Sequence, residues 1–157
     1  MIIYTKEFAK QSEENRMFQN KRIIITGGAN GIGRCIAQAF LSEGAFVTVI
    51  DIDKESGETL QRNYKNLNFF HGDIAEKEVL EQFVQSINST VNCLINNAGI
   101  GRGGLLSACT YEDFEYVQRV GLTAPYYLVQ QLVQNNLLAT NGIYRKHIFY
   151  SCFTITA

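Results

Sequence analysis

The sequence predicts one α/β domain with a doubly wound parallel β-sheet, in which helices cover both faces of the sheet. Three observations predict this fold. Short apolar runs rich in β-branched residues alternate with stretches of helical periodicity. The apolar runs are nearly continuous, as is typical of strands buried on both faces. The chain has 157 residues, 46% of them hydrophobic, with one proline and no internal repeat, which favours a single globular domain.

Four strands are expected, each a short run rich in Ile, Val, Leu or Phe. They are Arg22–Thr26, Phe46–Ile50, Asn68–His71 and Val91–Ile95. Right-handed crossovers would join them into one sheet. The domain would end after the fourth strand or a poorly formed fifth, which leaves an apolar strand edge prone to aggregation.

Helical spacing fills the intervals between the expected strands. Gly44 stands where the first crossover helix would end, and Thr110 with Asp113 three residues later resembles a capped helix start. The periodic apolar residues are Ile32, Ile36, Ala39 and Phe40 in the first crossover, and Val79, Leu80, Phe83, Val84 and Ile87 in the third.

The chain divides into three expected regions. Residues 1–20 form a polar extension without the features of a secretory signal, and Met17 is an alternative start to Met1. Residues 21–142 form the domain, and residues 143–157 an atypical tail. The net charge of −1, with scattered basic residues, argues against nucleic-acid binding. No apolar run approaches the roughly 20 residues of a membrane span.

Four cysteines and two histidines show neither C-x-x-C nor zinc-ligand spacing, so no metal site is expected. Cys35 and Cys93 lie in apolar patterns and are interpreted as small core residues. This use of cysteine favours a reducing, cytoplasmic setting.

The glycine-rich stretch TGGANGIG, residues 26–33, joins the first strand to the first helix. Gly27 permits a tight bend, Gly31 lets the backbone approach a pyrophosphate, and Gly33 lets the helix pack closely on the strand. The helix N-terminus supplies free N–H groups for an anion. Strand and helix flank the turn in the order that a dinucleotide site requires.

Asp51 ends the second strand, about 20 residues beyond the turn. A carboxylate there can accept hydrogen bonds from both hydroxyls of an adenosine ribose and would repel a 2′-phosphate. Asn30 supplies no compensating positive charge, so NAD is preferred over NADP. The alternative is that Asp51 only caps or solvates the strand end.

Two further motifs follow strands at the sheet edge where open α/β sheets bind ligands. His71-Gly72-Asp73-Ile74 follows the third strand, and Asn96-Asn97-Ala98-Gly99 follows the fourth. Asparagine and glycine there turn the chain sharply and place backbone groups against a ligand.

Residues 21–134 resemble the short-chain dehydrogenase/reductase family. The resemblance rests on four motifs that stand in the order and at the spacing of that family, namely TGGANGIG, Asp51, Asp73-Ile74 and NNAG. The resemblance implies a Rossmann-type fold, hydride transfer between NAD(H) and an alcohol or ketone, and assembly into homo-oligomers through the fourth and fifth helices. It implies cofactor contacts along the whole dinucleotide. The implied residues are Gly27, Asn30, Gly31, Ile32 and Gly33 at the pyrophosphate, Asp51 at the adenosine ribose, Asp73 and Ile74 near adenine, and Asn97, Ala98 and Gly99 beside the nicotinamide ribose.

The family's catalytic residues are not matched. The family uses a tyrosine with a lysine four residues later, and no tyrosine of this chain has that lysine. The family's helix asparagine falls on Gly121, and Ser151 stands among residues that do not fit the family's serine strand. No catalytic residue is therefore assigned.

One hypothesis explains the atypical tail as a one-base frameshift near Gly142. Read one nucleotide later, the codons of residues 144–152 can spell I-V-N-I-S-S-T-R-A, the expected strand and serine. The nucleotide sequence tests this, because the actual codons either spell that motif or do not.

Three functions remain open: an oxidoreductase that is inactive as presented, a non-catalytic NAD-binding or interaction module acting through residues 110–138, and a fragment without function. The substrate is not predicted. Arg102, among Gly101, Gly103 and Gly104, could meet an anionic substrate. Tyr126 and Tyr127 are interpreted as core or helix-interface residues.

Overall fold

The computed structural model describes residues 16–101 and 108–146, with the side chains of residues 140–146 excepted. The glycine loop with Arg102, the first fifteen residues, and the tail with Ser151 and Cys152 lie outside the described residues. No helix in the described ranges is long and apolar enough to span a membrane.

The elements alternate between strand and helix through the first four strands. In chain order they are β1 (Arg22–Thr26), α2 (Gly31–Ser42), β2 (Phe46–Asp51), α3 (Lys54–Asn63), β3 (Leu67–His71), α4 (Lys77–Ser86), β4 (Val91–Asn96), α5 (Tyr111–Gln118), the π-helix η2 (Arg119–Thr123), α6 (Ala124–Gln134) and β5 (Leu138–Lys146). The strands make one parallel sheet in the order β3-β2-β1-β4-β5. The doubly wound fold is confirmed, with each predicted strand extended by at most one residue at an end.

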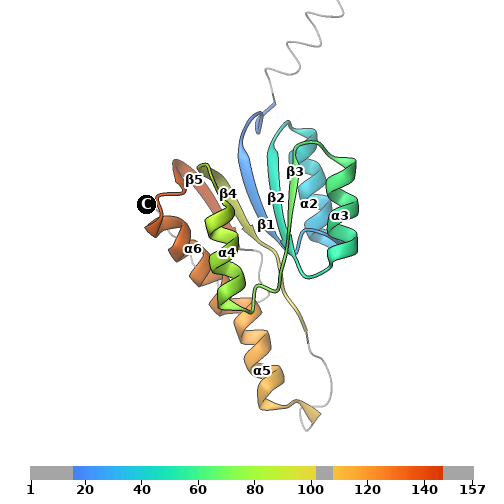
Figure 1. The fold of residues 1–157 in the computed structure, drawn as a ribbon, viewed down its shortest axis with the longest axis vertical. Helices are drawn as coiled ribbons and strands as arrows, with labels where there is room; N and C mark the ends of the chain where they lie inside the picture. The colour runs from blue at the N-terminus through green and yellow to red at the C-terminus, as the bar shows by residue number, and fades with distance from the viewer. Residues whose placement is uncertain (1–15, 102–107, 147–157) are drawn as a thin grey trace, which may run out of the picture.

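Alternation along the strands divides the core between the two faces of the sheet. In β1, Ile23 and Ile25 pack under α2 and α3, and Ile24 packs under α4 and α6. Figure 1 shows α2 and α3 on one side of the sheet and α4 and α6 on the other. Phe83 of α4 is fully buried and meets the ring of Phe70 edge-on, with centroids 5.2 Å apart.

Helix α2 runs as predicted, and of its four predicted apolar residues Ile36 and Phe40 pack against the core, whereas Ile32 and Ala39 are exposed. Its buried residues are Gly33 and Ala37. Cys35 is exposed, so its interpretation as a core residue is wrong, whereas Cys93 on β4 is buried as expected. Gly44, with a φ of +78°, lies just beyond the end of the helix, as predicted.

The last strand, β5, pairs with β4 as the outer strand of the described sheet. The pairing joins Val91 to Leu138 and Cys93 to Ile143, with an irregularity between them. The strand continues four residues past position 142, where the sequence predicts that the domain ends. The hydrogen bonds between the strands join backbone N–H and C=O groups, which do not depend on the identity of the side chain. This pairing therefore does not test the frameshift hypothesis.

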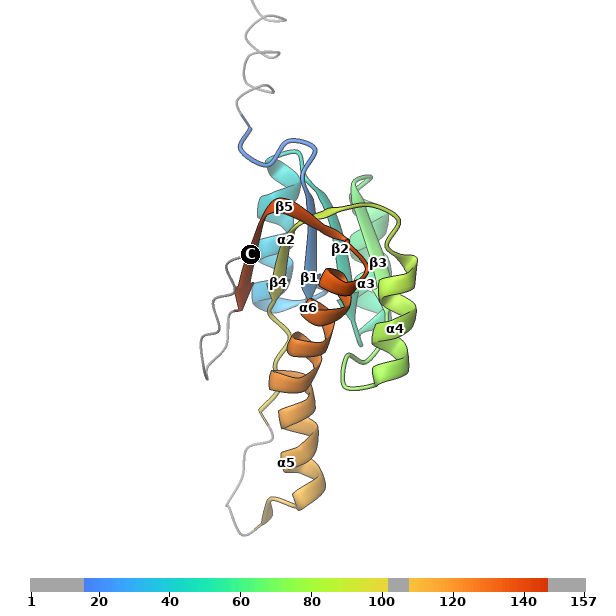
Figure 2. The same cartoon turned by 90° about the vertical axis from the view of Figure 1, so that its left-hand side faces the viewer.

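Helices α5 and α6 are separated by the π-helix, which coincides with Gly121. Figure 2 shows α5 extending beyond the carboxyl ends of the strands, with α6 leading back to the sheet. Thr110 caps α5 as predicted, since its Oγ1 accepts the Asp113 N–H at 3.1 Å. Tyr127 packs against the core and donates a hydrogen bond to Glu81 of α4, as interpreted, whereas Tyr126 is 63% exposed and is not a core residue.

Replacing Gly121 with alanine is expected to raise the free energy of unfolding by about 0.5–1 kcal/mol, because glycine is a poor helix former. Its φ is not positive, and a Cβ there would have nothing within 4 Å. Denaturant unfolding of G121A tests this, with Gly57→Ala as the matched control. A Cβ on Gly57 would strike the ring of Phe69, so that variant should be less stable. Loss of stability in G121A would contradict the expectation.

Candidate functional site

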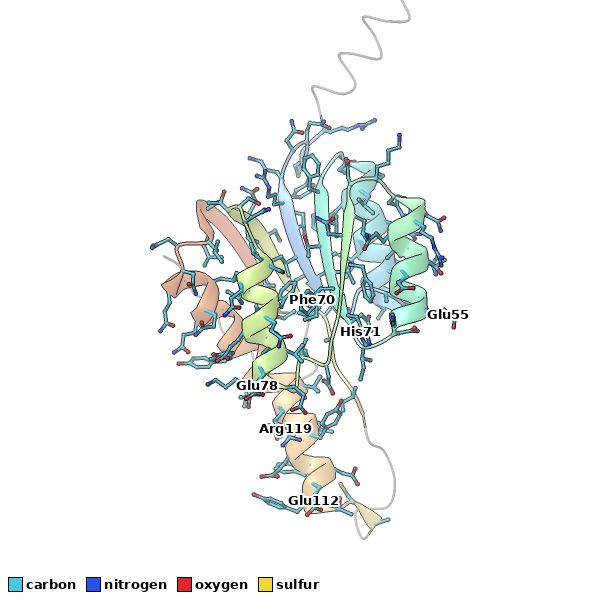
Figure 3. The ribbon with its side chains drawn as sticks, viewed as in Figure 1. Glu55, Phe70, His71, Glu78, Glu112 and Arg119 are labelled. Carbon is cyan, nitrogen blue, oxygen red and sulfur yellow. The ribbon has the colours of Figure 1, made fainter. Side chains whose placement is uncertain are left out.

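The carboxyl ends of four strands form a cleft of about 380 Å³. All eleven residues that the sequence analysis assigned to a cofactor line this one cleft. They come from the turn after β1, the end of β2, the segment after β3 and the segment after β4. Figure 3 marks this edge of the sheet with His71, the last residue of β3. Helical residues farther along the chain, Tyr116 and Val120, close the cleft from the other side.

The glycine turn is held in place by the NNAG segment. The N–H groups of Asn97 and Ala98 both donate to the Thr26 hydroxyl, at 3.1 and 3.0 Å. The Asn97 side-chain amide donates to the carbonyl oxygens of Thr26 and Gly27, at 3.1 and 2.8 Å. Asn97, which the resemblance places beside the nicotinamide ribose, therefore uses its side-chain amide to fix the turn.

The glycines of the turn meet different surroundings. A Cβ on Gly27, which has a φ of +66°, would lie 2.8 Å from the Cα of Ala98. A Cβ on Gly33 would strike the carbonyl oxygen of Gly27 and the amide of Asn97. Gly31 has a φ of +53° and nothing within 4 Å of a Cβ. A Cβ on Gly28 would lie 2.8 Å from Val49 Cγ2, so three of the four glycines serve close packing, and Gly31 opens onto the cleft.

The first turn of α2 presents its backbone N–H groups to the cleft. It begins with Gly31-Ile32-Gly33 and contains no acidic residue. Within the described residues the Asn30 side chain makes no cap hydrogen bond to this helix; its amide donates instead to the Asp53 carboxylate at 2.7 Å. Free N–H groups and the positive end of the helix dipole make this turn a suitable anion site.

The Asp51 carboxylate is fixed at the rim by two backbone donors. Its oxygens accept the N–H of Ala29 at 2.8 Å and the N–H of Asp53 at 3.0 Å. Asp53 caps helix α3, and the Ser56 N–H that it accepts lowers the pKa of its carboxyl. The two acidic residues therefore lie next to each other, with the Asp53 backbone N–H bound to the Asp51 carboxylate.

Asp73 is held in a similar way after β3. One oxygen accepts the N–H of Ala75 at 2.8 Å, and the other accepts the Tyr116 hydroxyl at 2.6 Å. The neighbouring Ile74 contributes to the cleft wall, with its side chain buried in the core. An exposed apolar rim completes the entrance, made by Ile32, Ile52 and Ile100.

Sequence reasoning missed six residues of the cleft, namely Ile50, Ile52, Gly72, Ile100, Tyr116 and Val120. Gly72 lies inside a motif that the sequence analysis named but was assigned no role, and Ile50, Ile52 and Ile100 each adjoin an assigned residue. Tyr116 and Val120 come from a helical region about 20 residues beyond NNAG, and no local pattern indicates that they reach the cleft.

Comparisons with known proteins identify the family. Residues 21–142 match the model of the short chain dehydrogenase family. The chain is 30% identical over 130 residues to a 3-oxoacyl-(acyl-carrier-protein) reductase of Chlamydia pneumoniae, covering 78% of this chain and 52% of the relative.

Two solved structures show the same architecture. An apo SCOR enzyme of Clostridium thermocellum is 37% identical, with a TM-score of 0.73 over 82% of this chain and 54% of its own. A 3-ketoacyl-(acyl-carrier-protein) reductase of Brucella melitensis, complexed with NADH, is 26% identical, with a TM-score of 0.69 over 74% of this chain and 50% of its own. The chain thus spans about half the length of these relatives. By its sequence and its fold, the chain belongs to the short-chain dehydrogenase family.

Proposed function

We propose that this chain is the dinucleotide-binding part of a nicotinamide-dependent oxidoreductase and that it binds NAD(H) in preference to NADP(H). The observation that supports the proposal best is the gathering of all eleven predicted residues around one cleft. The volume of that cleft lies within the range usual for small-molecule sites.

The residues present fit such a cofactor. The open surface at Gly31 and the N–H groups of the first turn of α2 would hold the pyrophosphate. Asp51 would hold the adenosine ribose and Asp73 the adenine, each with a carboxylate already fixed by backbone donors. Asn97, Ala98 and Gly99 would adjoin the nicotinamide ribose. The bound nicotinamide supplies the hydride acceptor or donor.

The preference for NAD rests on charge. Each oxygen of Asp51 already accepts one N–H and keeps a lone pair for a ribose hydroxyl. A 2′-phosphate at the same place carries a charge of about −1.5 to −2 at neutral pH. It would face both Asp51 and the ionised Asp53, and the neighbouring Asn30 offers only a neutral amide. Repulsion between like charges disfavours the phosphate.

Proton exchange with a substrate needs residues that this sequence does not contain. A phenol with a pKa of about 10 needs a nearby cation to work near neutrality, and no tyrosine has a lysine four residues later. We therefore expect binding without turnover from these 157 residues. The oxoacyl reductases among the relatives favour a carbonyl–alcohol pair as the substrate class of the whole protein.

A fluorescence titration of the chain with NADH tests the proposal. The expected result is saturable binding that NAD displaces, with no oxidation of NADH by ketones and no reduction of NAD by alcohols. Absence of saturable binding at millimolar NADH would contradict the binding function, and turnover with any alcohol or ketone would contradict the catalytic part.

A second candidate is a non-catalytic module that senses NAD or pairs with a partner or a second copy through α5 and α6. The observation that favours it is a set of exposed apolar side chains on these helices and on η2. They are Tyr111, Phe114, Leu122, Tyr126 and Val133. NAD binding without turnover in a longer form of the protein would favour this candidate.

For both candidate functions, the exposed thiols of Cys35 and Cys109 suit a reducing, cytoplasmic setting.

A further inference from the structure

Helix α5 is attached to the domain at few points. None of its eight residues is buried, and in the described part of the chain it packs mainly against the π-helix that follows it. Figure 3 shows its exposed end with Glu112 and its junction with η2 at Arg119, away from the body of the sheet. A helix with so little burial depends on a few specific contacts for its position.

Tyr116 provides one of these contacts. Its ring is half-buried against the core cluster under α4 and α6, and its hydroxyl donates to the Asp73 carboxylate at 2.6 Å. The guanidinium of Arg119 lies over the ring, 5.7 Å from its centroid. A short hydrogen bond from a hydroxyl to a carboxylate is among the stronger kinds in proteins.

The same hydrogen bond reaches the cleft. Tyr116 and Asp73 both line it, on the side that the proposed function assigns to adenine. With one Asp73 oxygen bound to the Ala75 N–H and the other to Tyr116, the carboxylate cannot rotate without breaking a contact. Its remaining lone pairs therefore point in fixed directions, ready to accept the 6-amino group of adenine.

We propose that Tyr116 is a positioning residue that holds Asp73 for adenine recognition and couples nucleotide binding to the packing of helix α5. The inference rests on the proposed function. Coupling between two sites is reciprocal. A nucleotide bound at Asp73 therefore stabilises the packed position of α5, and loss of the Tyr116 hydroxyl lowers the affinity for the nucleotide.

Tyr116→Phe tests the proposal, because it removes the hydroxyl and keeps the ring under Arg119. The matched control is Tyr111→Phe on the same helix, where the side chain is 70% exposed. Affinities are measured for NAD and for nicotinamide hypoxanthine dinucleotide, which replaces the 6-amino group with a carbonyl oxygen. Hydrogen exchange of the α5 amides is measured with and without NAD.

The wild-type chain and Y111F should prefer NAD over the hypoxanthine analogue, and NAD should slow exchange in α5. In Y116F we expect NAD affinity to fall by roughly tenfold, the preference for NAD to shrink, and the protection of α5 by NAD to disappear. If Tyr116 had a purely structural role, Y116F would lower the affinities for both dinucleotides by the same factor.

The possible failures are distinguishable. If Y116F binds NAD as the wild type does, keeps the same preference and shows the same protection of α5, the role of Tyr116 is overturned while the proposed function stands. If Y116F lowers the affinities for both dinucleotides equally, adenine recognition through Tyr116 is likewise overturned. If the wild-type chain binds neither dinucleotide, the proposed function fails and the coupling fails with it.

Discussion

Replacing Gly31 with aspartate is expected to lower NAD affinity by roughly a hundredfold or more, because it places a carboxylate where the pyrophosphate would bind. Gly31 is the glycine of the turn at which a side chain meets no atom within 4 Å, so the fold need not move to accept one. Its φ of +53° is one that aspartate and asparagine adopt more readily than other residues. Calorimetric titration with NAD measures the loss.

Gly31→Asn is the matched control, because it has the shape of aspartate without the charge. It carries the same backbone strain and the same bulk. We expect G31N to lose much less affinity than G31D and both variants to unfold at similar denaturant concentrations. Equal binding by G31D and the wild type would place the pyrophosphate elsewhere. Equal losses of NAD affinity in the two variants would mean that the bulk of the side chain, and not its charge, causes the loss.

Replacing Gly33 with alanine is expected to destabilise the domain by on the order of 2–4 kcal/mol, because the added methyl group meets backbone atoms that cannot move aside. Its Cβ would strike the carbonyl oxygen of Gly27 and the amide of Asn97. Those groups form the 2.8 Å hydrogen bond that joins the turn to the NNAG segment. The variant therefore strains helix packing and the turn together.

Denaturant unfolding measures this effect, with Gly99→Ala as the control. Gly99 also lines the cleft, but a Cβ there would meet only the carbonyl oxygen of Asn97, at an ordinary 3.9 Å. G99A should unfold close to the wild type. A G33A variant as stable as G99A would contradict the close packing of α2 on the turn.

The sequence was sufficient to predict the sheet and the composition of most of the cleft. Nearly continuous apolar runs, such as Ile23-Ile24-Ile25 in β1, fit strands that helices cover on both faces of a parallel sheet. Since the carboxyl ends of parallel strands meet at one edge, motifs that follow four such runs had to converge there. Asp51 was found by this reasoning, and the segment with Asp73 was placed at the same edge by it, whereas the role of Asp73 near adenine came from the family resemblance.

The parts that the sequence did not predict depend on rotation and tertiary packing. Cys35 lies two residues from each of the buried residues of α2, Gly33 and Ala37, and a helix rotates by about 100° per residue, so Cys35 falls on the opposite, exposed face of the helix. Helix α3 buries only Gly57 and Leu60, which is too weak a pattern to assign its residues. Tyr116 reaches Asp73 across 43 positions of sequence, and no local rule covers such a contact.

The most direct test of the central claim compares the affinities of NAD and NADP for the wild-type chain and for Asp51→Asn. The carboxamide loses the charge that opposes a 2′-phosphate, and its single oxygen can still accept one of the two backbone N–H groups. Glu55→Gln, which removes a charge from the first turn of α3 outside the cleft, is the control. The wild-type chain and E55Q should bind NAD at least tenfold more tightly than NADP, and D51N should lose most of that preference. Equal affinities in the wild-type chain, or an unchanged preference in D51N, would contradict the assignment of this cleft to NAD.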